Sequence, residues 1–340
     1  MTPDVITIGR RRVGPGAPVF VIAEIGMNHN GDLDLARRMI ESAAACGVDA
    51  VKFQSFRTEA FLSDRIPGLE ERRQYEIPEA WYPELMAVAE KAGVAFFSTP
   101  LDAGSAATLA ACDVPCFKIA SCDLTNLPLI EQVAALGKPV IISTGFGRLD
   151  EVERAVKTAR GAGNRQLILM HCVALYPTPP EAANLRAIET LREAFGLPVG
   201  LSDHSREETA IPVLAAGLGA VALEKHFTID RDLPGYDHGM SETPESLTRI
   251  VAAVRQVPAI LGHGRLERSE EELARRTTAR RGLYWTSDLA AGATIAPENL
   301  IPLRPSHEVA PCALPDLVGK TLLKPVSGGS AVSLGDLDLG

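Results

Sequence analysis

Eight short, almost continuously apolar runs recur through the first 230 residues and restrict the possible folds more than any other feature. They lie at 19–23, 50–53, 95–98, 116–119, 140–143, 167–171, 199–202 and 220–225. Runs of this length without polar alternation are typical of parallel strands that are covered on both faces. Helical periodicity predicts helices between and after them at 33–46, 79–92, 149–162, 184–195, 207–216 and 244–261.

The alternation of these segments predicts an α/β fold. Eight strand–helix units in about 260 residues match the (β/α)8, or TIM, barrel. An open doubly wound sheet has the same alternation, but no G-x-G-x-x-G motif follows the first strand, where residues 24–31 form a polar loop. We therefore expect a TIM-barrel catalytic domain over residues 1–262.

The C-terminal part of the chain has a different residue pattern, without the alternation of apolar runs and helices. A charged run makes 263–281 a linker, and residues 282–340 are expected to form a small β-rich domain. Short strand candidates in it lie at 283–285, 293–295, 300–303, 320–325 and 331–334. A domain of about 60 residues buries little core by itself, so we expect it to pack on something else.

Composition excludes several classes of protein. Hydrophobic residues make up 46% of the chain, which argues against a disordered protein. A formal charge of −9 argues against a general nucleic-acid binder. The N-terminus lacks the pattern of a signal peptide, and no apolar stretch reaches the roughly 20 residues that span a bilayer. We expect a cytoplasmic protein with no membrane or nucleic-acid partner, and six reduced cysteines, because no CxxC occurs.

Ionisable residues stand inside or directly after the apolar runs. In a TIM barrel such positions lie at the catalytic end. Lys52 and Lys118 interrupt apolar runs, and a buried lysine is costly unless it meets an anion. With four hydroxyl residues they predict a cradle for a phosphate or carboxylate; these are Thr99, Ser121, Ser143 and Ser202. Three alternatives stay open: a lysine that points outward, a lysine paired with Glu24, or a lysine that forms a Schiff base.

Two histidines end the seventh and eighth runs. His204 and His226 would lie on adjacent strands, where two neutral imidazoles could bind a divalent metal and leave positions open for substrate. Hydrogen-bonded histidines without a metal are the alternative. His29 and His171 are weaker candidates. Glu24, at the end of the first run, is a candidate general base or a counter-ion for Lys52.

Taken together, these motifs resemble the sialic acid (N-acetylneuraminate) synthase family. The matching stretches follow one another over most of the chain: IAEIGMNHNG at 22–31, VKFQ at 51–54, FSTP at 97–100, FKIAS at 117–121, ISTG at 142–145, HCV at 171–173, YPTP at 176–179, GLSDH at 200–204 and EKHFT at 224–228. Residues 280–337 look like the antifreeze-protein-like (SAF) domain of that family.

The resemblance implies a reaction and a set of roles. Phosphoenolpyruvate would condense with the open-chain aldehyde of an N-acylated hexosamine such as N-acetylmannosamine, giving a nine-carbon 2-keto-3-deoxy sugar acid and phosphate. His204 and His226 would bind manganese, with magnesium or cobalt as alternatives, and Glu24 would act on the attacking water. The cradle would hold phosphoenolpyruvate, and the sugar would meet Gln54, Tyr176, Asp237 and Arg304.

The family resemblance also implies a domain-swapped homodimer, in which the small domain and its Arg304 cover the barrel of the partner subunit. Two stretches depart from the family pattern: Tyr236 precedes Asp237, and Ser306, His307 and Glu308 follow Arg304-Pro305. A synthase of legionaminic, pseudaminic or spore-coat-type sugar acids, or one that uses an unusual aldose, is therefore an alternative. A Schiff-base pyruvate lyase and a carbohydrate- or partner-binding protein are more distant ones.

Overall fold

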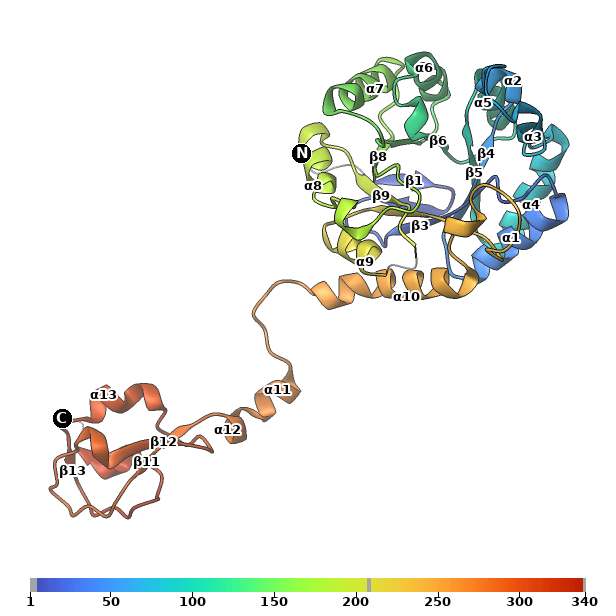
Figure 1. The fold of residues 1–340 in the computed structure, drawn as a ribbon. Coiled ribbons are helices and arrows are strands. Elements are labelled where there is room, and N and C mark those ends of the chain that lie inside the picture. Colours follow the sequence, from blue (N-terminus) through green and yellow to red (C-terminus); the bar gives the residue numbers. More distant parts are fainter. Residues whose placement is uncertain (1–4, 207–208, 339–340) are drawn as a thin grey trace. The chain divides into compact units, whose positions relative to one another are not determined.

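The computed structural model describes residues 5–206 and 209–338. The chain divides into two compact units, Met1–Gly262 and His263–Gly340, which are taken in turn (Figure 1). Within the described residues no helix has the length and apolar character needed to cross a membrane.

Eight parallel strands of the first unit close into a barrel. They are β3 (Phe20–Gly26), β4 (Ala50–Ser55), β5 (Ala95–Pro100), β6 (Phe117–Ile119), β7 (Val140–Ser143), β8 (Leu167–Cys172), β9 (Val199–Asp203) and β10 (Ala222–His226). Each strand pairs with the next, and β10 closes the circle against β3, with His226 opposite Glu24. The predicted TIM barrel is confirmed.

A helix follows each strand and covers the outside of the barrel (Figure 1). The helices are α1 (Leu33–Ala45), α4 (Tyr82–Ala92), α5 (Ala103–Ala111), α6 (Leu127–Ala135), α7 (Leu149–Gly161), α8 (Ala187–Phe195), α9 (Ala210–Gly217) and α10 (Pro244–Leu261). Their ends follow local chemistry: the Asp32 carboxylate caps the first amides of α1, and Gly93, with a φ of 79°, ends α4. Their apolar faces pack on the outward-facing residues of the strands.

The sequence predictions missed α5 and α6. Helix α5 is rich in alanine, so its apolar periodicity is weak. Part of the helix predicted at 207–216 falls on 207–208, which lie outside the described residues. Short elements occupy the loops after the strands: α2 (Thr58–Phe61), α3 (Leu69–Arg73) and the 3-10 turns η1 (Glu79–Trp81), η2 (Ser121–Asp123), η3 (Pro180–Ala182) and η4 (His238–Met240).

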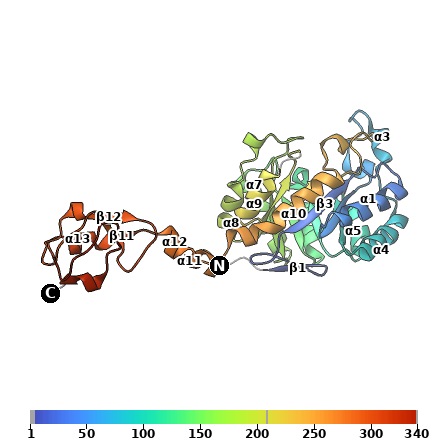
Figure 2. The same ribbon diagram turned by 90° about the horizontal axis from the view of Figure 1, so that it is seen from below.

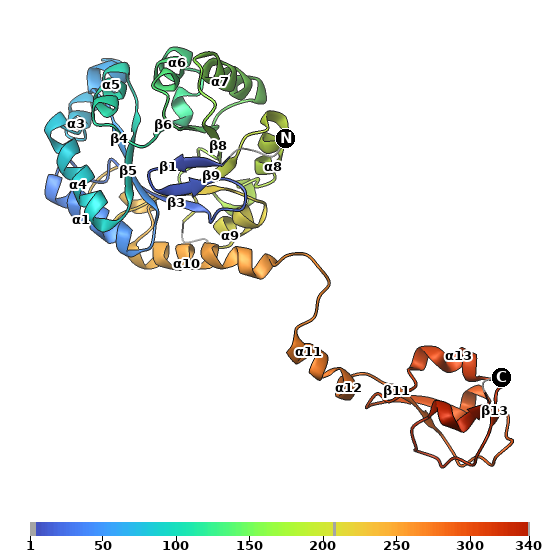
Figure 3. The same ribbon diagram turned by 180° about the vertical axis from the view of Figure 1, so that it is seen from behind.

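An antiparallel hairpin closes the amino end of the barrel. It consists of β1 (Ile6–Ile8) and β2 (Arg11–Val13), which the sequence predictions did not include. Figure 3 shows it across the barrel opening, and Figure 2 shows it at the opposite end from α3. Ile6, Ile8 and Val13 are buried against the lowest apolar layer inside the barrel, which includes Phe20 and Phe97. The chemistry must therefore lie at the other end.

The second unit is small and β-rich. Its strands β11 (Gly282–Trp285) and β12 (Leu300–Leu303) pair, as do β13 (Thr321–Leu322) and β14 (Leu337–Asp338). Its helices and 3-10 turns are α11 (Glu270–Ala274), α12 (Arg276–Ala279), η5 (Pro297–Asn299), η6 (Pro311–Ala313), α13 (Leu314–Leu317) and η7 (Leu334–Asp336). A modest core gathers around Trp285 and Leu283.

Two strand predictions in this unit are wrong. Residues 293–295 and 331–334 contribute only single bridges, Thr294 to Thr321 and Ala331 to Tyr284. Their apolar residues Ile295 and Val332 are buried in the core, but the adjacent turns interrupt the ladder before it extends. The linker boundaries at 263 and 281 stay a prediction.

The hairpin predicts a stability effect. Ile8 is fully buried, whereas Thr7 of the same strand is exposed. We expect Ile8→Ala to lower the free energy of unfolding by about 2–5 kcal/mol, because it leaves a cavity beneath the barrel. Thr7→Ala should change it by less than about 0.5 kcal/mol. Urea unfolding monitored by circular dichroism measures both, and equal effects would show that the hairpin adds nothing to the core.

Candidate active site

The inside of the barrel is layered because side chains alternate between the two faces of a strand. The lowest layer is apolar. Two residues further along each strand, the same face carries a polar group. This second layer consists of Glu24, Lys52, Thr99, Lys118, Ser143, Cys172, Ser202 and Glu224, all buried. Glu24, both lysines and three of the four predicted hydroxyl residues therefore lie on different strands but at the same level of the barrel.

Two lysines and two glutamates form a closed charge network at this level. Lys52 Nζ lies 2.8 Å from Glu24 Oε2 and 3.6 Å from Glu224 Oε1. Lys118 Nζ lies 3.6 Å from the same Glu224 oxygen. The alternative in which Lys52 pairs with Glu24 is thus the one observed, and neither lysine points outward. The four charges sum to zero, which makes their burial tolerable.

Neutral groups hold the network in place. Lys52 Nζ donates to Thr99 Oγ1 at 3.0 Å, and Gln54 Nε2 donates to Glu24 Oε1 at 3.2 Å. Ser202 Oγ donates to Glu224 Oε1 at 3.2 Å.

Burial and neighbouring charges shift the pKa values of Glu24 and Glu224 in opposite directions. Burial raises the pKa of Glu24 to about 6, even though the Lys52 ammonium opposes the shift. Burial also acts on Glu224, but Lys118 and Lys52 outweigh it and lower its pKa. Burial lowers the pKa of Lys118, whereas for Lys52 the carboxylates Glu224 and Glu24 outweigh burial and raise the pKa. Glu24 is therefore the carboxyl group that can exchange a proton near neutral pH.

Two further serines approach the same space. Ser121 Oγ accepts a hydrogen bond from the Gly145 amide at 3.0 Å and donates to Cys172 Sγ at 3.4 Å. Ser143 Oγ is buried, and no partner for it exists among the described residues. A hydroxyl in this state can hydrogen-bond an oxygen atom of a bound molecule.

The two candidate metal ligands lie side by side above this layer. The ring centroids of His204 and His226 are 5.3 Å apart. His204 Nδ1 lies 2.8 Å from the carbonyl oxygen of Val173, so Nδ1 donates and Nε2 keeps its lone pair. Burial lowers the pKa of His204 to about 4, and burial also lowers the pKa of His226. Both imidazoles are neutral at neutral pH.

These residues fit a divalent ion that keeps open positions. A metal needs unprotonated nitrogen, and His204 presents Nε2 in that form. His226 is buried with an Nδ1 atom that has no hydrogen-bond partner in the described part of the chain. No group of three or more His, Cys, Asp or Glu side chains that could hold a metal occurs in the described ranges. The protein would therefore supply two nitrogens, and water or substrate the remaining ligands.

The candidate sugar contacts are distributed differently. Tyr176 packs over His204, with ring centroids 4.2 Å apart, and Gln54 faces Glu24. Asp237 lies outside the cavity lining but reaches His226, with its Oδ2 3.7 Å from Nδ1. Arg304 is exposed in the second unit, where it follows β12. Its predicted role at the site stays a prediction.

A cavity of about 170 Å³ joins these groups. It is lined by Glu24, Lys52, Gln54, Thr99, Lys118, Ser121, Ser143, Tyr176, Ser202, His204 and His226, together with residues that were not predicted: Glu224, Cys172, Cys122, Phe61, Leu101, Ala120 and Phe146. Glu224 is the important omission. The sequence signal for Glu224 was its position two residues after Ala222, which places it on the same, inner face of the strand. Lys225 points outward to Asp203 and Glu242.

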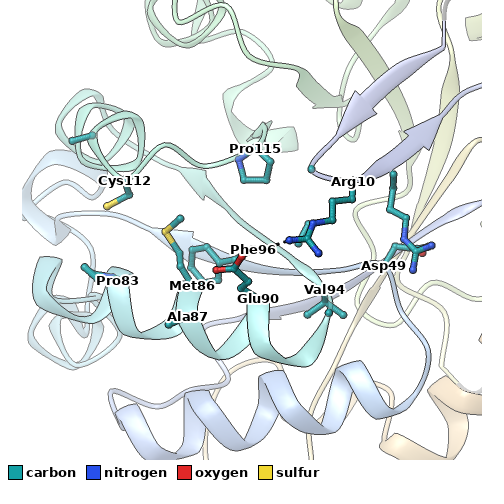
Figure 4. Close-up of a pocket in the computed structure, with 15 residues that line it drawn as sticks. Arg10, Asp49, Pro83, Met86, Ala87, Glu90, Val94, Phe96, Cys112 and Pro115 are labelled. Atoms are coloured by element: carbon teal, nitrogen blue, oxygen red, sulfur yellow. Dashed lines mark ion pairs between the residues drawn. The ribbon is translucent and has the colours of Figure 1, made fainter.

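A larger cavity of about 580 Å³ lies elsewhere (Figure 4). The hairpin, α4, the start of β5 and the end of α5 line it, and ion pairs of Arg10 with Glu90 and Arg11 with Asp49 lie at its edge. None of the candidate residues lines it. His29 and His171 line neither this cavity nor the smaller one: His29 Nδ1 accepts from the Gly31 amide, and His171 Nε2 bonds the Ala183 carbonyl. The smaller cavity is the candidate active site.

The charge network predicts a stability effect of Glu224. We expect Glu224→Gln to lower the free energy of unfolding by about 3–5 kcal/mol, because Lys118 then stays buried without a counter-ion. The matched control is Glu153→Gln, which removes an exposed ion pair to Lys157 and should cost less than about 1 kcal/mol. Urea unfolding at pH 7.5 measures both, and an equal, small loss would show that the network does not need Glu224.

The chain resembles known proteins along most of its length. Residues 39–266 match the NeuB family, and residues 280–338 match the SAF domain. The N,N'-diacetyllegionaminic acid synthase of Legionella pneumophila is 37% identical over 337 residues, 94% of each chain. The spore coat polysaccharide biosynthesis protein SpsE of Bacillus subtilis is 38% identical over 327 residues, 88% of this chain and 87% of that one.

A solved structure of a sugar-acid synthase is also similar to this chain. The crystal structure of N-acetylneuraminic acid (sialic acid) synthetase from Leptospira borgpetersenii, in complex with citrate, matches with 38% identity and a TM-score of 0.75. The match covers 82% of this chain and 98% of that chain. Synthases of this family are metal-dependent in general and act on small molecules. The chain with the charge network and the histidine pair therefore belongs to the NeuB family of sugar-acid synthases, with a SAF domain at its C-terminal end.

Proposed function

We propose that the protein condenses phosphoenolpyruvate with the open-chain aldehyde of an N-acylated amino sugar and releases phosphate. The product is a nine-carbon 2-keto-3-deoxy sugar acid. The observation that carries this proposal is the vertical order of groups in one cavity: two buried lysines with hydroxyls below, and two neutral imidazoles above. An anionic substrate and a polarised carbonyl would then meet face to face.

The lower layer suits phosphoenolpyruvate. Lys52 and Lys118 would pair with its phosphate and carboxylate, which compete with Glu24 and Glu224 for the ammonium groups. Thr99, Ser121, Ser143 and Ser202 would donate or accept hydrogen bonds around the same anions. Ser143 is ready for this role because its hydroxyl has no partner in the described structure.

The upper layer suits the aldehyde. His204 and His226 would hold a divalent ion, for which we propose manganese, with magnesium or cobalt as alternatives. When bound, this ion supplies a Lewis acid that polarises the aldehyde oxygen. Tyr176, stacked on His204, would form one wall for the sugar. Gln54 and Asp237 would contact its hydroxyls, and Arg304 would do so from the second unit.

The proposed reaction has three steps: carbon–carbon bond formation, addition of water and loss of phosphate. The enol carbon C3 of phosphoenolpyruvate forms a bond to the aldehyde carbon, whose oxygen takes a proton from solvent and becomes a hydroxyl. C2 is left as an oxocarbenium ion that still bears the phosphate. Glu24 stabilises this positive charge and takes a proton from the water that adds to C2. The bond from C2 to the phosphate oxygen then breaks, and its electron pair leaves with the phosphate. The new C2 hydroxyl gives its proton to that phosphate and becomes the keto oxygen, and Glu24 returns its own proton to solvent.

The acceptor would be an amino sugar with one or two N-acyl groups. The Legionella relative is named for a product with two N-acetyl groups, and this chain resembles it along 94% of its length. N-acetylmannosamine and diacetamido hexoses therefore both belong in the first panel of substrates, with pseudaminic- and spore-coat-type precursors beside them.

The reaction predicts metal-dependent phosphate release. With phosphoenolpyruvate, Mn²⁺ and one sugar of the panel, we expect one phosphate per product, and EDTA should abolish the signal. A malachite-green assay with mass spectrometry of the product measures this. A reduced lysine adduct after borohydride treatment with pyruvate, without phosphate release, would instead support the Schiff-base lyase.

Glu24 is predicted to carry the water step. Glu24→Gln keeps the size of the side chain but cannot take a proton, so we expect kcat to fall by about 10²–10⁴-fold. Glu181→Gln, at an exposed position of η3, should leave kcat unchanged. Steady-state kinetics in the presence of Mn²⁺ compares them, and an unimpaired Glu24→Gln enzyme would remove Glu24 from the mechanism.

We also propose a domain-swapped homodimer in which Arg304 completes the site of the partner. Light scattering should give about twice 36.3 kDa. A mixture of two inactive chains, Arg304→Ala and Glu24→Gln, should regain about a quarter of wild-type activity, because each mixed dimer contains one intact site. A monomeric mass, or no recovery from fully exchanged chains, would contradict the swap.

A further inference from the structure

Two loops from distant parts of the sequence meet beside Asp237. One carries α3 and the residues after it, and the other is the β10–α10 connection. The guanidinium carbon of Arg72 lies 3.7 Å from the centre of the Tyr236 ring, and the Tyr75 ring meets the same ring edge-on at 5.5 Å. The Tyr236 ring thus has a cation on its face and packs edge-on with an aromatic ring. These two contacts hold Tyr236, the residue directly before Asp237, in place.

The α3 side of this contact is firmly anchored. Tyr75 is buried in a small apolar cluster with Phe56 and Leu101, and Leu101 also lines the catalytic cavity. The Tyr75 amide donates to the Arg72 carbonyl at 3.0 Å, so the two residues form one turn. Arg72 therefore reaches Tyr236 from a support that belongs to the wall of the active site.

The connection that carries Asp237 is held at other points. Asn30 Nδ2 donates to the Pro234 carbonyl at 2.7 Å, and Ser241 Oγ donates to the Asp237 carbonyl at 2.6 Å. Gly235 has a φ of 144°, and a Cβ atom there would lie 2.8 Å from Asn30 Oδ1. These contacts fix the backbone on both sides of Tyr236. Tyr236 as a whole residue is 46% exposed, and Arg72 and Tyr75 lie against its ring.

The position of Asp237 matters because of His226. Its carboxylate oxygen lies 3.7 Å from the buried Nδ1 of His226, which has no hydrogen-bond partner in the described chain. A metal-binding histidine normally donates its second N–H to a carboxylate, which orients the ring. A movement of about 1 Å by Asp237 would complete such a hydrogen bond and leave Nε2 for the ion.

We propose that Arg72 is a positioning residue of this site: by stacking on Tyr236 it holds Asp237 against His226. This inference rests on the proposed function, because it assumes that His226 binds the metal. Arg72 is assigned no contact with either substrate. Arg73, its neighbour on α3, instead pairs with Glu59 and Glu70 at the surface, so it provides a matched control.

The test is Mn²⁺ affinity of the full-length protein without substrates, measured by electron paramagnetic resonance. We expect Asp237→Asn to weaken binding about 10–100-fold. Arg72→Ala should weaken it about two- to five-fold, the range of a partly exposed cation–π contact. Arg72→Lys and Tyr236→Phe keep the cation and the ring and should retain most of the affinity, and Arg73→Ala should match the wild type.

A double-mutant cycle separates positioning from general damage. Arg72→Ala combined with Tyr236→Ala should weaken Mn²⁺ binding no more than Tyr236→Ala alone, because both act through one contact. Additive losses, or wild-type affinity in Arg72→Ala, would overturn the role of Arg72. Unchanged affinity in Asp237→Asn would overturn the role of Asp237. A wild-type protein that does not bind Mn²⁺ at all would instead refute the metal site of the proposed function.

Discussion

Closure of eight parallel strands into a barrel is the constraint on which the other features depend. It removes every free edge and forces alternate side chains of each strand into a narrow interior. The hairpin fills the amino end with Ile6, Ile8 and Val13, so the inner residues become polar only toward the carboxyl end. The same geometry that excludes water from the lower layer therefore concentrates ionisable groups in the upper one.

Charge balance follows from that concentration. Four ionisable groups at one level of a barrel are tolerable because their charges cancel and each is hydrogen-bonded or paired. Glu224 is central, since it lies within 3.6 Å of both lysines. Binding of phosphoenolpyruvate, a trianion, would disturb this balance of charge. A divalent ion at the histidines and a proton on Glu24, whose pKa burial raises to about 6, are two ways of restoring it.

The site could be predicted in part. Glu24, Lys52, Lys118 and the two histidines were accessible from the sequence because each interrupts or ends an apolar run. Glu224 was not singled out, although it stands between Lys225 and Leu223 in the same run. The spacing to Ala222 was the available signal, and the register of β10 against β3 and β9 shows that Glu224 faces inward and Lys225 outward, where Asp203 and Glu242 neutralise it.

The sequence by itself determined the class of the fold, the end of the barrel that carries the chemistry and most of the polar groups there. Those properties are local: apolar run length, helix periodicity and the residue that follows each strand. The tertiary structure alone decided which charges pair, that His204 bonds the Val173 carbonyl through Nδ1, and that Arg72 reaches Tyr236 across more than 160 positions of chain. Such facts depend on side-chain distances between separate strands and loops, which a one-dimensional pattern does not contain.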